Sequence, residues 1–321
     1  RAMPGIEADE AHLFDYPVAD ADLLVLRRLE SVCLYRAASA PHPEQGDPWL
    51  ATALELRRRR FDRMRPEHIR YEQAQELNEG LARYIEDRTS GRAVESRFPE
   101  AGWWPPEAVR TRTYTTGQVW ALALDRHLPG WKEMVAAGMM PSLDVPLAAT
   151  LAARGIDPRP VEGADHAAVA AAARTDADRY HERLASLRAA FEATPGWTLR
   201  VQVEEGAPLL APQGFDPLNV IVLGDGLVLH QRMVRLGNAR GRVEVLDAES
   251  TTFGPGKHPL FNGVRTLEVA GLEDAPRLDA ENGRVSLRQP GVELELEGAT
   301  VTRDPQAEVV VVRLTAEPDT G

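Results

Sequence analysis

The stretch Ala193-Thr-Pro-Gly-Trp-Thr-Leu-Arg-Val-Gln-Val203 marks the point at which the chain changes its secondary structure. Before it, residues 166–194 are rich in Ala, Leu, Arg and Glu, which favour a helix, and Pro195-Gly196 ends that run. After it, Thr198 to Val203 alternates polar and apolar side chains, which is typical of a β-strand. We therefore expect an α+β protein with a helical half at residues 1–195 and a β domain at residues 196–321.

The N-terminal half is predicted to consist mostly of helices. Apolar residues between Leu23 and Tyr35 follow helical spacing, and Asp20 is expected to cap the start of that helix. We expect residues 41–48, which contain three prolines and a glycine, to form a loop. Further helices are expected at residues 49–65, 66–89, 116–128, 131–137, from 142 onward, and over 166–194.

The C-terminal part is predicted to contain many short strands. Residues 242–246 and 292–297 alternate with a period of two, and residues 309–314 are mostly β-branched. Residues 219–223 and 227–230 are separated by Gly-Asp-Gly, which predicts a hairpin. Many short strands over this length are typical of an antiparallel sandwich or barrel.

Charge and composition exclude several classes of protein. The 321 residues carry 37 Lys and Arg against 49 Asp and Glu, a formal net charge of −12, which disfavours non-specific binding to nucleic acid or to an anionic membrane surface. No run of apolar residues approaches the length of roughly 18 that a membrane span requires. The single cysteine, Cys33, excludes intrachain disulfides and zinc sites built from several cysteines, and it leaves the compartment open.

The most informative motif is Asn78-Glu79-Gly80-Leu81-Ala82. It resembles the second metal-binding helix of the gluzincin metallopeptidases, in which an earlier helix with His-Glu-x-x-His supplies two zinc ligands and the general base. The resemblance implies that Glu79 is a zinc ligand and that Zn²⁺ is the cofactor. The small residues Gly80 and Ala82 would let neighbouring helices approach closely.

Residues downstream of this motif extend the likeness. Tyr114-Thr-Thr-Gly117, a helix, Trp131-Lys132 and then Ser142-Leu-Asp144 follow in an order similar to that of many bacterial zincin-like proteins. The likeness covers about residues 20 to 155. It implies that Tyr114 is a catalytic residue whose phenol stabilises the oxyanion during amide hydrolysis.

One part of the family pattern is missing, because no His-Glu-x-x-His occurs in the 321 residues and every histidine is isolated. We expect the motif to lie upstream in a longer parent chain, or in a separate or cleaved N-terminal segment that completes the site. The function expected from the resemblance is a zinc-dependent peptide-bond hydrolase acting on a peptide or protein substrate. The alternative is a non-catalytic or degenerate peptidase-like protein that serves as a partner-binding or structural module.

Plainer interpretations of the same residues stay open. On a helical wheel Glu72, Glu79 and Glu86 lie opposite Leu77 and Leu81, which is also the pattern of a surface helix. The run of arginines from 57 to 60 is typical of a charged helix face, partly compensated by Glu55 and Asp62. His230, within a predicted strand, is expected to be structural rather than a ligand.

Overall fold

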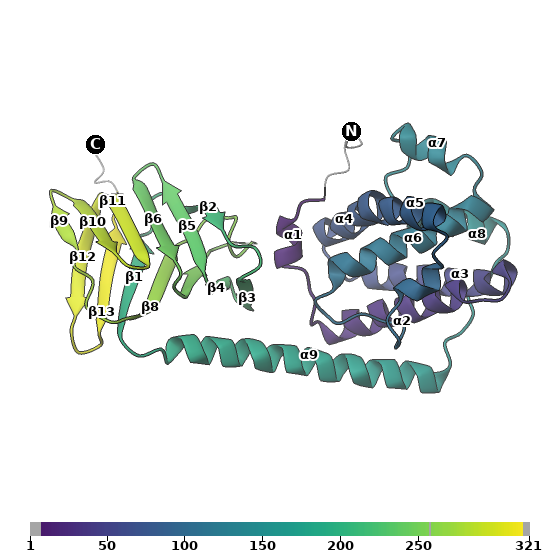
Figure 1. Ribbon diagram of the computed structural model, residues 1–321, viewed down its shortest axis with the longest axis horizontal. Helices are drawn as coiled ribbons and strands as arrows, with labels where there is room; N and C mark the ends of the chain where they lie inside the picture. Colours follow the sequence, from purple (N-terminus) through teal and green to yellow (C-terminus); the bar gives the residue numbers. More distant parts are fainter. Residues whose placement is uncertain (1–7, 257, 317–321) are drawn as a thin grey trace. The chain divides into compact units, whose positions relative to one another are not determined.

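The computed structural model describes residues 8–256 and 258–316 (Figure 1). The chain separates into two compact units, one ending at His181 and the other beginning at Glu182. The helices are α1 (Ala11–Phe14), α2 (Ala21–Ala38), α3 (Pro43–Phe61), α4 (Pro66–Gln75), the π-helical turn η1 (Glu76–Gly80), α5 (Leu81–Ser90), the 3₁₀ turn η2 (Val94–Arg97), α6 (Val109–His127), α7 (Trp131–Ala136), α8 (Asp144–Ala153) and α9 (Gly163–Glu192).

Helix α3 begins earlier than the sequence suggested. It starts at Pro43, so the expected loop at residues 41–48 is wrong over most of its length. Pro43 occupies the start of the helix, where its missing N–H costs no hydrogen bond. Gly46 lets α3 approach α2, since a Cβ atom there would lie 2.6 Å from the Ala37 carbonyl oxygen. The expected helix over 66–89 exists as α4, η1 and α5 in succession.

The core of the helical unit is formed mainly by the apolar sides of α2, α3 and α6. Leu34, Leu50, Leu77, Trp120 and Leu124 are almost completely buried in it. At roughly 1.5–3 kcal/mol for each large apolar side chain removed from water, this core supplies most of the driving force for packing the helices together. None of the described helices is long and apolar enough to cross a membrane.

The β unit has two sheets that share one apolar core, so the predicted α+β class is confirmed. Within residues 8–256 and 258–316, a seven-stranded sheet has the order β12-β13-β1-β8-β7-β4-β3 and a six-stranded sheet has the order β2-β5-β6-β11-β10-β9. The strands are β1 (Trp197–Val203), β2 (Ala211–Phe215), β3 (Val220–Gly224), β4 (Leu227–His230), β5 (Met233–Asn238), β6 (Gly241–Leu246), β7 (Ser250–Phe253), β8 (Thr266–Leu272), β9 (Asp279–Glu281), β10 (Arg284–Gln289), β11 (Val292–Glu297), β12 (Ala299–Asp304) and β13 (Val309–Leu314).

Pairing within the sheets follows the alternation of the sequence. Leu199, Val201 and Val203 of β1 are buried while the residues between them are partly exposed, so one face of the sheet covers the core. The predicted hairpin is β3–β4, paired antiparallel. Strand β1 pairs antiparallel with β8 and parallel with β13, which brings the C-terminal strand beside the first one.

His230 lies in the core of the β unit and is completely buried. Its Nε2 is 2.9 Å from the Thr252 hydroxyl, and its Nδ1 and the nearby Ser250 hydroxyl have no hydrogen-bond partner among the described residues. Burial disfavours the charged imidazolium and lowers the pKa of His230 from 6.5 to about 4. The imidazole is therefore neutral at pH 7.

This burial predicts acid sensitivity of the β unit. Because the unfolded chain binds a proton near pH 6.5 and the folded chain only near pH 4, the stability from His230 is complete above pH 6.5 and is lost as pH falls toward 4, by up to about 3 kcal/mol. Hydrogen exchange of β1 and β8 amides, compared between wild type and His230→Gln at pH 7 and pH 4.5, should show a smaller acid effect in the variant. The exposed His166→Gln control should follow wild type, and parallel losses in all three proteins would contradict the prediction.

Candidate functional site

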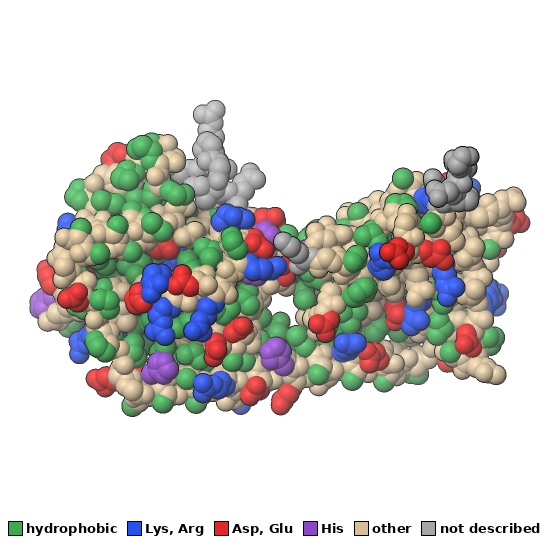
Figure 2. Space-filling view, turned by 180° about the vertical axis from the view of Figure 1, so that it is seen from behind, with side chains coloured by type: hydrophobic (Ala, Val, Ile, Leu, Met, Phe, Trp, Pro, Cys, Tyr) green, Lys and Arg blue, Asp and Glu red, His purple; other side chains and the backbone are tan. Residues whose placement is uncertain are grey.

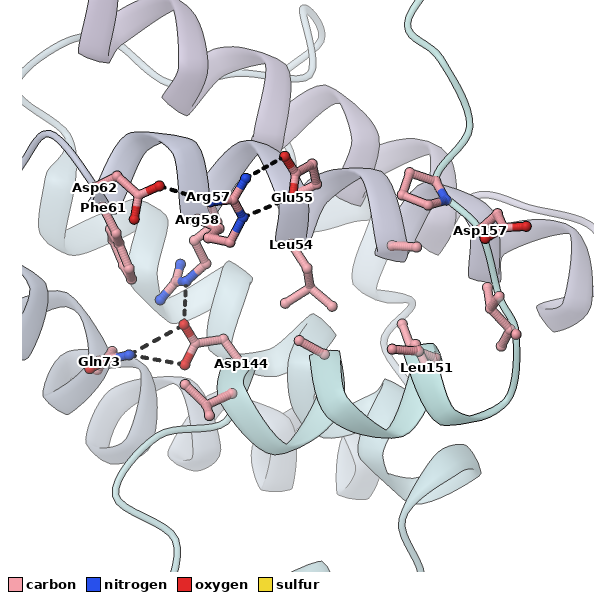
Figure 3. A pocket seen from close by; sticks show the side chains of 17 residues that line it. Leu54, Glu55, Arg57, Arg58, Phe61, Asp62, Gln73, Asp144, Leu151 and Asp157 are labelled. Atoms are coloured by element: carbon pink, nitrogen blue, oxygen red, sulfur yellow. Dashed lines mark hydrogen bonds and ion pairs between the residues drawn. The ribbon is translucent and has the colours of Figure 1, made fainter.

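The run of arginines on α3 divides between the surface and the interior. Arg58 is exposed and pairs with Glu55 and Asp62, as a charged helix face predicts (Figure 3). Arg57 and Arg60 instead are almost completely buried, so the charged-face interpretation is wrong for these two residues. Helical spacing puts them on the side of α3 that carries its buried leucines, and only buried partners can compensate their charge there.

Arg57 is bound by carboxylates from three other elements. Its Nη1 and Nη2 donate to the two oxygens of Glu76 on η1 at 2.9 and 2.5 Å. Nη1 also donates to Glu30 Oε1 on α2 at 3.0 Å, and Nε donates to Asp144 Oδ2 on α8 at 2.8 Å. Thr116 of α6 adds a hydrogen bond of 2.7 Å to Glu76 Oε1. One guanidinium thereby connects α2, α3, η1 and α8.

Arg60 and Arg112 complete this buried ion network. Arg60 donates to Glu72 Oε1 at 2.5 Å and to Glu30 Oε2 at 2.8 Å, and Arg112 of α6 donates to Glu72 Oε2 at 2.6 Å. The Tyr16 hydroxyl also donates to Glu72. Since an unpaired buried charge is very costly, these bidentate and shared bonds are what make the burial of so many charges possible.

The network has one carboxylate more than it has guanidinium groups. Glu30, Glu72, Glu76 and Asp144 are joined by ion pairs to Arg57, Arg60 and Arg112. Burial, together with the neighbouring Asp144 and Glu72, raises the pKa of Glu76 to about 7 against the attraction of Arg57. At neutral pH a proton on Glu76 would balance the charges of the network.

Loss of Arg57 should therefore be far more damaging than loss of its neighbour. Arg57→Met leaves Glu76, Asp144 and Glu30 without their shared partner, and we expect a loss of about 3–5 kcal/mol in unfolding free energy. Arg58→Met, an identical change one residue away on the surface, should leave stability almost unchanged. Urea unfolding followed by far-ultraviolet circular dichroism measures both, and similar midpoints for the two variants would contradict the role given to the network.

A trough lies beside the network, between α3 and α8. Its volume is about 520 Å³, and Figure 3 shows Arg57, Asp144 and Gln73 at one end and the segment with Asp157 at the other. The walls between these ends are apolar, and they are formed by Ala51, Leu54, Phe61, Val145, Ala148, Leu151 and Ile156.

The trough is acidic as well as apolar. Its lining contains four carboxylates against two guanidinium groups, an excess of two negative charges; these residues are Glu55, Asp62, Asp144, Asp157, Arg57 and Arg58. Asp144 is largely buried, and interactions with Arg57, Ser142 and Gln73 lower its pKa although burial works in the opposite direction. It is therefore ionised at neutral pH. More widely, the face of the molecule in Figure 2 carries acidic, basic and apolar side chains interspersed.

The predicted site residues Glu79 and Tyr114 lie near each other at Arg110. Glu79 is on η1 with a side chain 39% exposed, and its Oε1 is 3.4 Å from Arg110 Nη2. The pKa of Arg110 is raised: partial burial opposes its charge, but Glu10 and a hydrogen bond with Tyr114 outweigh that effect. Sequence reasoning anticipated neither Arg110 nor its position between these two residues.

The expected close approach at Gly80 is present. A Cβ atom on Gly80 would lie 2.7 Å from Gly117 Cα, so η1 and α6 touch backbone to backbone. In contrast, Ala82 is exposed and takes no part in this contact. The glycine pair fixes where η1, and with it Glu79, lies against α6.

These residues do not by themselves fit a zinc ion. In the described part of the chain, no three His, Cys, Asp or Glu side chains gather as a metal site would require. The one donor implied by the resemblance, Glu79, is paired with a guanidinium. Any zinc held by Glu79 needs imidazole ligands from outside these residues.

The chain was compared with protein-family models, curated proteins and solved structures. No protein-family model, curated protein or solved structure matches this chain.

Proposed function

We propose that the helical unit is a non-catalytic, peptidase-like module that binds an apolar, basic segment of a partner protein in the trough between α3 and α8. The observation that carries this proposal is the composition of the trough: apolar walls with an excess of two negative charges in the lining. Concave sites that combine an apolar surface with a few fixed polar groups are the usual form of binding sites.

The apolar part of the trough supports binding of aliphatic side chains. Val145 is 63% exposed, and Ala148 stands beside it on the same wall. Each large apolar side chain that a partner buries there would contribute roughly 1.5–3 kcal/mol before the entropy of ordering is subtracted. Small residues such as Ala51 and Ala148 leave the space that those side chains would fill.

The charged part of the trough supports selection of a basic partner. Arg58 is compensated by Glu55 and Asp62, and Arg57 is compensated by carboxylates of the network. Asp157, at the opposite end of the trough, therefore adds a negative charge that neither guanidinium group of the lining compensates. A lysine or arginine of the partner would meet that charge. The net charge of −12 adds attraction for basic segments within the screening length, which is about 8 Å at physiological ionic strength.

The network beneath the trough supports a preformed site. Asp144 is fixed by Arg57 at 2.8 Å and by Gln73 at 3.1 Å, so one end of the trough needs little rearrangement on binding. A rigid site loses less conformational entropy when it is occupied.

Filling the trough should abolish binding. Ala148→Phe places a large ring in it, whereas Ala149→Phe places the same ring on the exposed side of α8. An amphipathic helical peptide of about 16 residues, with leucines on one face and lysines on the other, should bind wild type and Ala149→Phe alike and Ala148→Phe at least about tenfold more weakly. Isothermal titration calorimetry measures the affinities, and equal binding to all three proteins would contradict the proposal.

A zinc-dependent peptide-bond hydrolase is our second proposal. It is supported by the match of Asn78-Glu79-Gly80 to the gluzincin pattern and by the proximity of Glu79 and Tyr114 at Arg110. The proposal requires two histidine ligands and a general base from outside the described residues. Glu79 would then supply a carboxylate ligand and Tyr114 a hydrogen-bond donor toward the substrate carbonyl.

The metal content of the natural full-length protein tests this second proposal. Glu79→Gln should reduce bound zinc to background and abolish peptide hydrolysis, because an amide is a much poorer zinc ligand than a carboxylate. Glu86→Gln, on the exposed side of α5, is the matched control and should retain both. Normal zinc content and normal activity in Glu79→Gln would refute the role of Glu79.

A further inference from the structure

A second concave surface lies on the helical unit, away from the trough, between α5 and α7. Its volume is about 680 Å³, and its lining is mostly apolar: Leu81, Tyr84, Ile85, Trp131, Val135 and Ala136. Ile85 is 60% exposed, which is unusual for so large an aliphatic side chain on an ordered helix. We call this surface the α5–α7 groove.

A single carboxylate fixes the aromatic floor of this groove. Asp125 of α6 accepts hydrogen bonds from the Tyr84 hydroxyl at 2.5 Å and from the Trp131 indole N–H at 3.0 Å. The two rings pack edge to face with their centroids 6.0 Å apart. Tyr84 and Trp131 are themselves almost completely buried, so they form a rigid floor beneath the exposed side chain of Ile85.

The same carboxylate holds two cations at the edge of the groove. Arg88 Nη1 is 2.8 Å and Lys132 Nζ is 2.9 Å from Asp125. Arg88 and Lys132 lie 5.6 and 5.4 Å from the ring centroids of Tyr84 and Trp131 respectively. Both cations are more than half exposed, so they can also meet a group in solution. These are the charged residues of the lining, and both are positive.

We propose that the α5–α7 groove is a docking site for an acidic, amphipathic helical segment of a partner protein. Apolar side chains of that segment pack on Leu81, Ile85 and Ala136 above the buried rings, while its carboxylates pair with Arg88 and Lys132. A helix in a groove between two helices is a recurrent mode of peptide recognition, with anchors at i, i+3 or i+4, and i+7. The charge of the groove, opposite to that of the trough and of the whole chain, selects the acidic occupant.

Three peptides that share one apolar face test this proposal. Each has about 16 residues and leucines at helical spacing, and the polar face is glutamate, glutamine or lysine. Isothermal titration calorimetry with the Ala148→Phe variant of the full chain, in which the trough is filled, should give the order of affinity glutamate over glutamine over lysine. Binding of the glutamate peptide should weaken as salt is raised, because exposed charge pairs are screened.

Two matched variants assign the binding to the groove. Ile85→Ser and Val145→Ser remove aliphatic side chains of almost equal exposure, 60% and 63%, from the groove and the trough respectively. Ile85→Ser should weaken the glutamate peptide at least about tenfold and leave the lysine peptide unchanged, and Val145→Ser should do the reverse. Because both side chains are exposed, both variants should fold, as circular dichroism will show.

Replacement of the cations provides a separate readout. The double variant Arg88→Gln with Lys132→Gln should reduce the affinity for the glutamate peptide to that for the glutamine peptide, and its salt dependence should disappear. Asp125 stays bonded to Tyr84 and Trp131 in that variant, so the aromatic floor is retained.

Several outcomes would overturn the proposal. They are a dissociation constant of the glutamate peptide above about 100 µM, equal affinity of the Ala148→Phe variant for all three peptides, or unchanged binding of the glutamate peptide in Ile85→Ser. Sedimentation equilibrium adds one more: a dimer of wild type that Ile85→Ser dissociates would show that a second copy of this chain occupies the groove. None of these results bears on the trough, for which Val145→Ser and Ala148→Phe report separately.

Discussion

The constraint on which the helical unit depends is the compensation of buried charge. Arg57, Arg60 and Arg112 are held by carboxylates from α2, α4, η1 and α8, and almost every oxygen and nitrogen involved has a partner. A network of this kind adds little net stability over a well-packed apolar core, but it tolerates almost no misplacement, because each unpaired charge costs several kcal/mol. It therefore specifies how these helices align, while the leucines around it supply the driving force.

The π-helical turn η1 lies where three requirements meet on neighbouring residues. Glu72 and Glu76 both point into the network, four residues apart on one face, while Leu77 must reach the apolar core. Gly80 must also lie against Gly117, where no side chain fits. The wider turn changes the phase of the helix after Glu76. Glu72 is buried, Glu79 half-buried and Glu86 exposed, so the acidic stripe expected from an unbroken helical wheel is not one surface.

The fold could be predicted because its helices and strands follow from the pattern of neighbouring residues in the sequence. The change at Pro195-Gly196 marks where α9 gives way to β1, and the alternation of β1, β6 and β11 reads directly as strands with one buried face. The network was not predictable in the same way. Arg57 and Glu76 are 19 residues apart in the sequence, and each is of a residue type that is usually exposed. Only their helical spacing relative to buried leucines indicates that their side chains face the interior. Arg110 was missed for the same reason: its role depends on a neighbour, Glu79, on another helix.

Each of the two concave surfaces contains or covers one carboxylate that is engaged by its neighbours, so the charge of each surface comes from the residues around that carboxylate. Asp144 is paired with Arg57, and the excess negative charge of the trough comes from Glu55, Asp62 and Asp157. Asp125 is bonded to Tyr84 and Trp131 and is paired with two cations, Arg88 and Lys132, which leave a positive rim. The chain's net charge of −12 repels an acidic partner at long range. At physiological ionic strength, however, that repulsion is largely screened beyond about 8 Å, while pairs formed at contact persist. The same screening limits the attraction of a basic partner, so both surfaces would discriminate between partners mainly at contact, the trough through Asp157 and the groove through Arg88 and Lys132 beside Ile85.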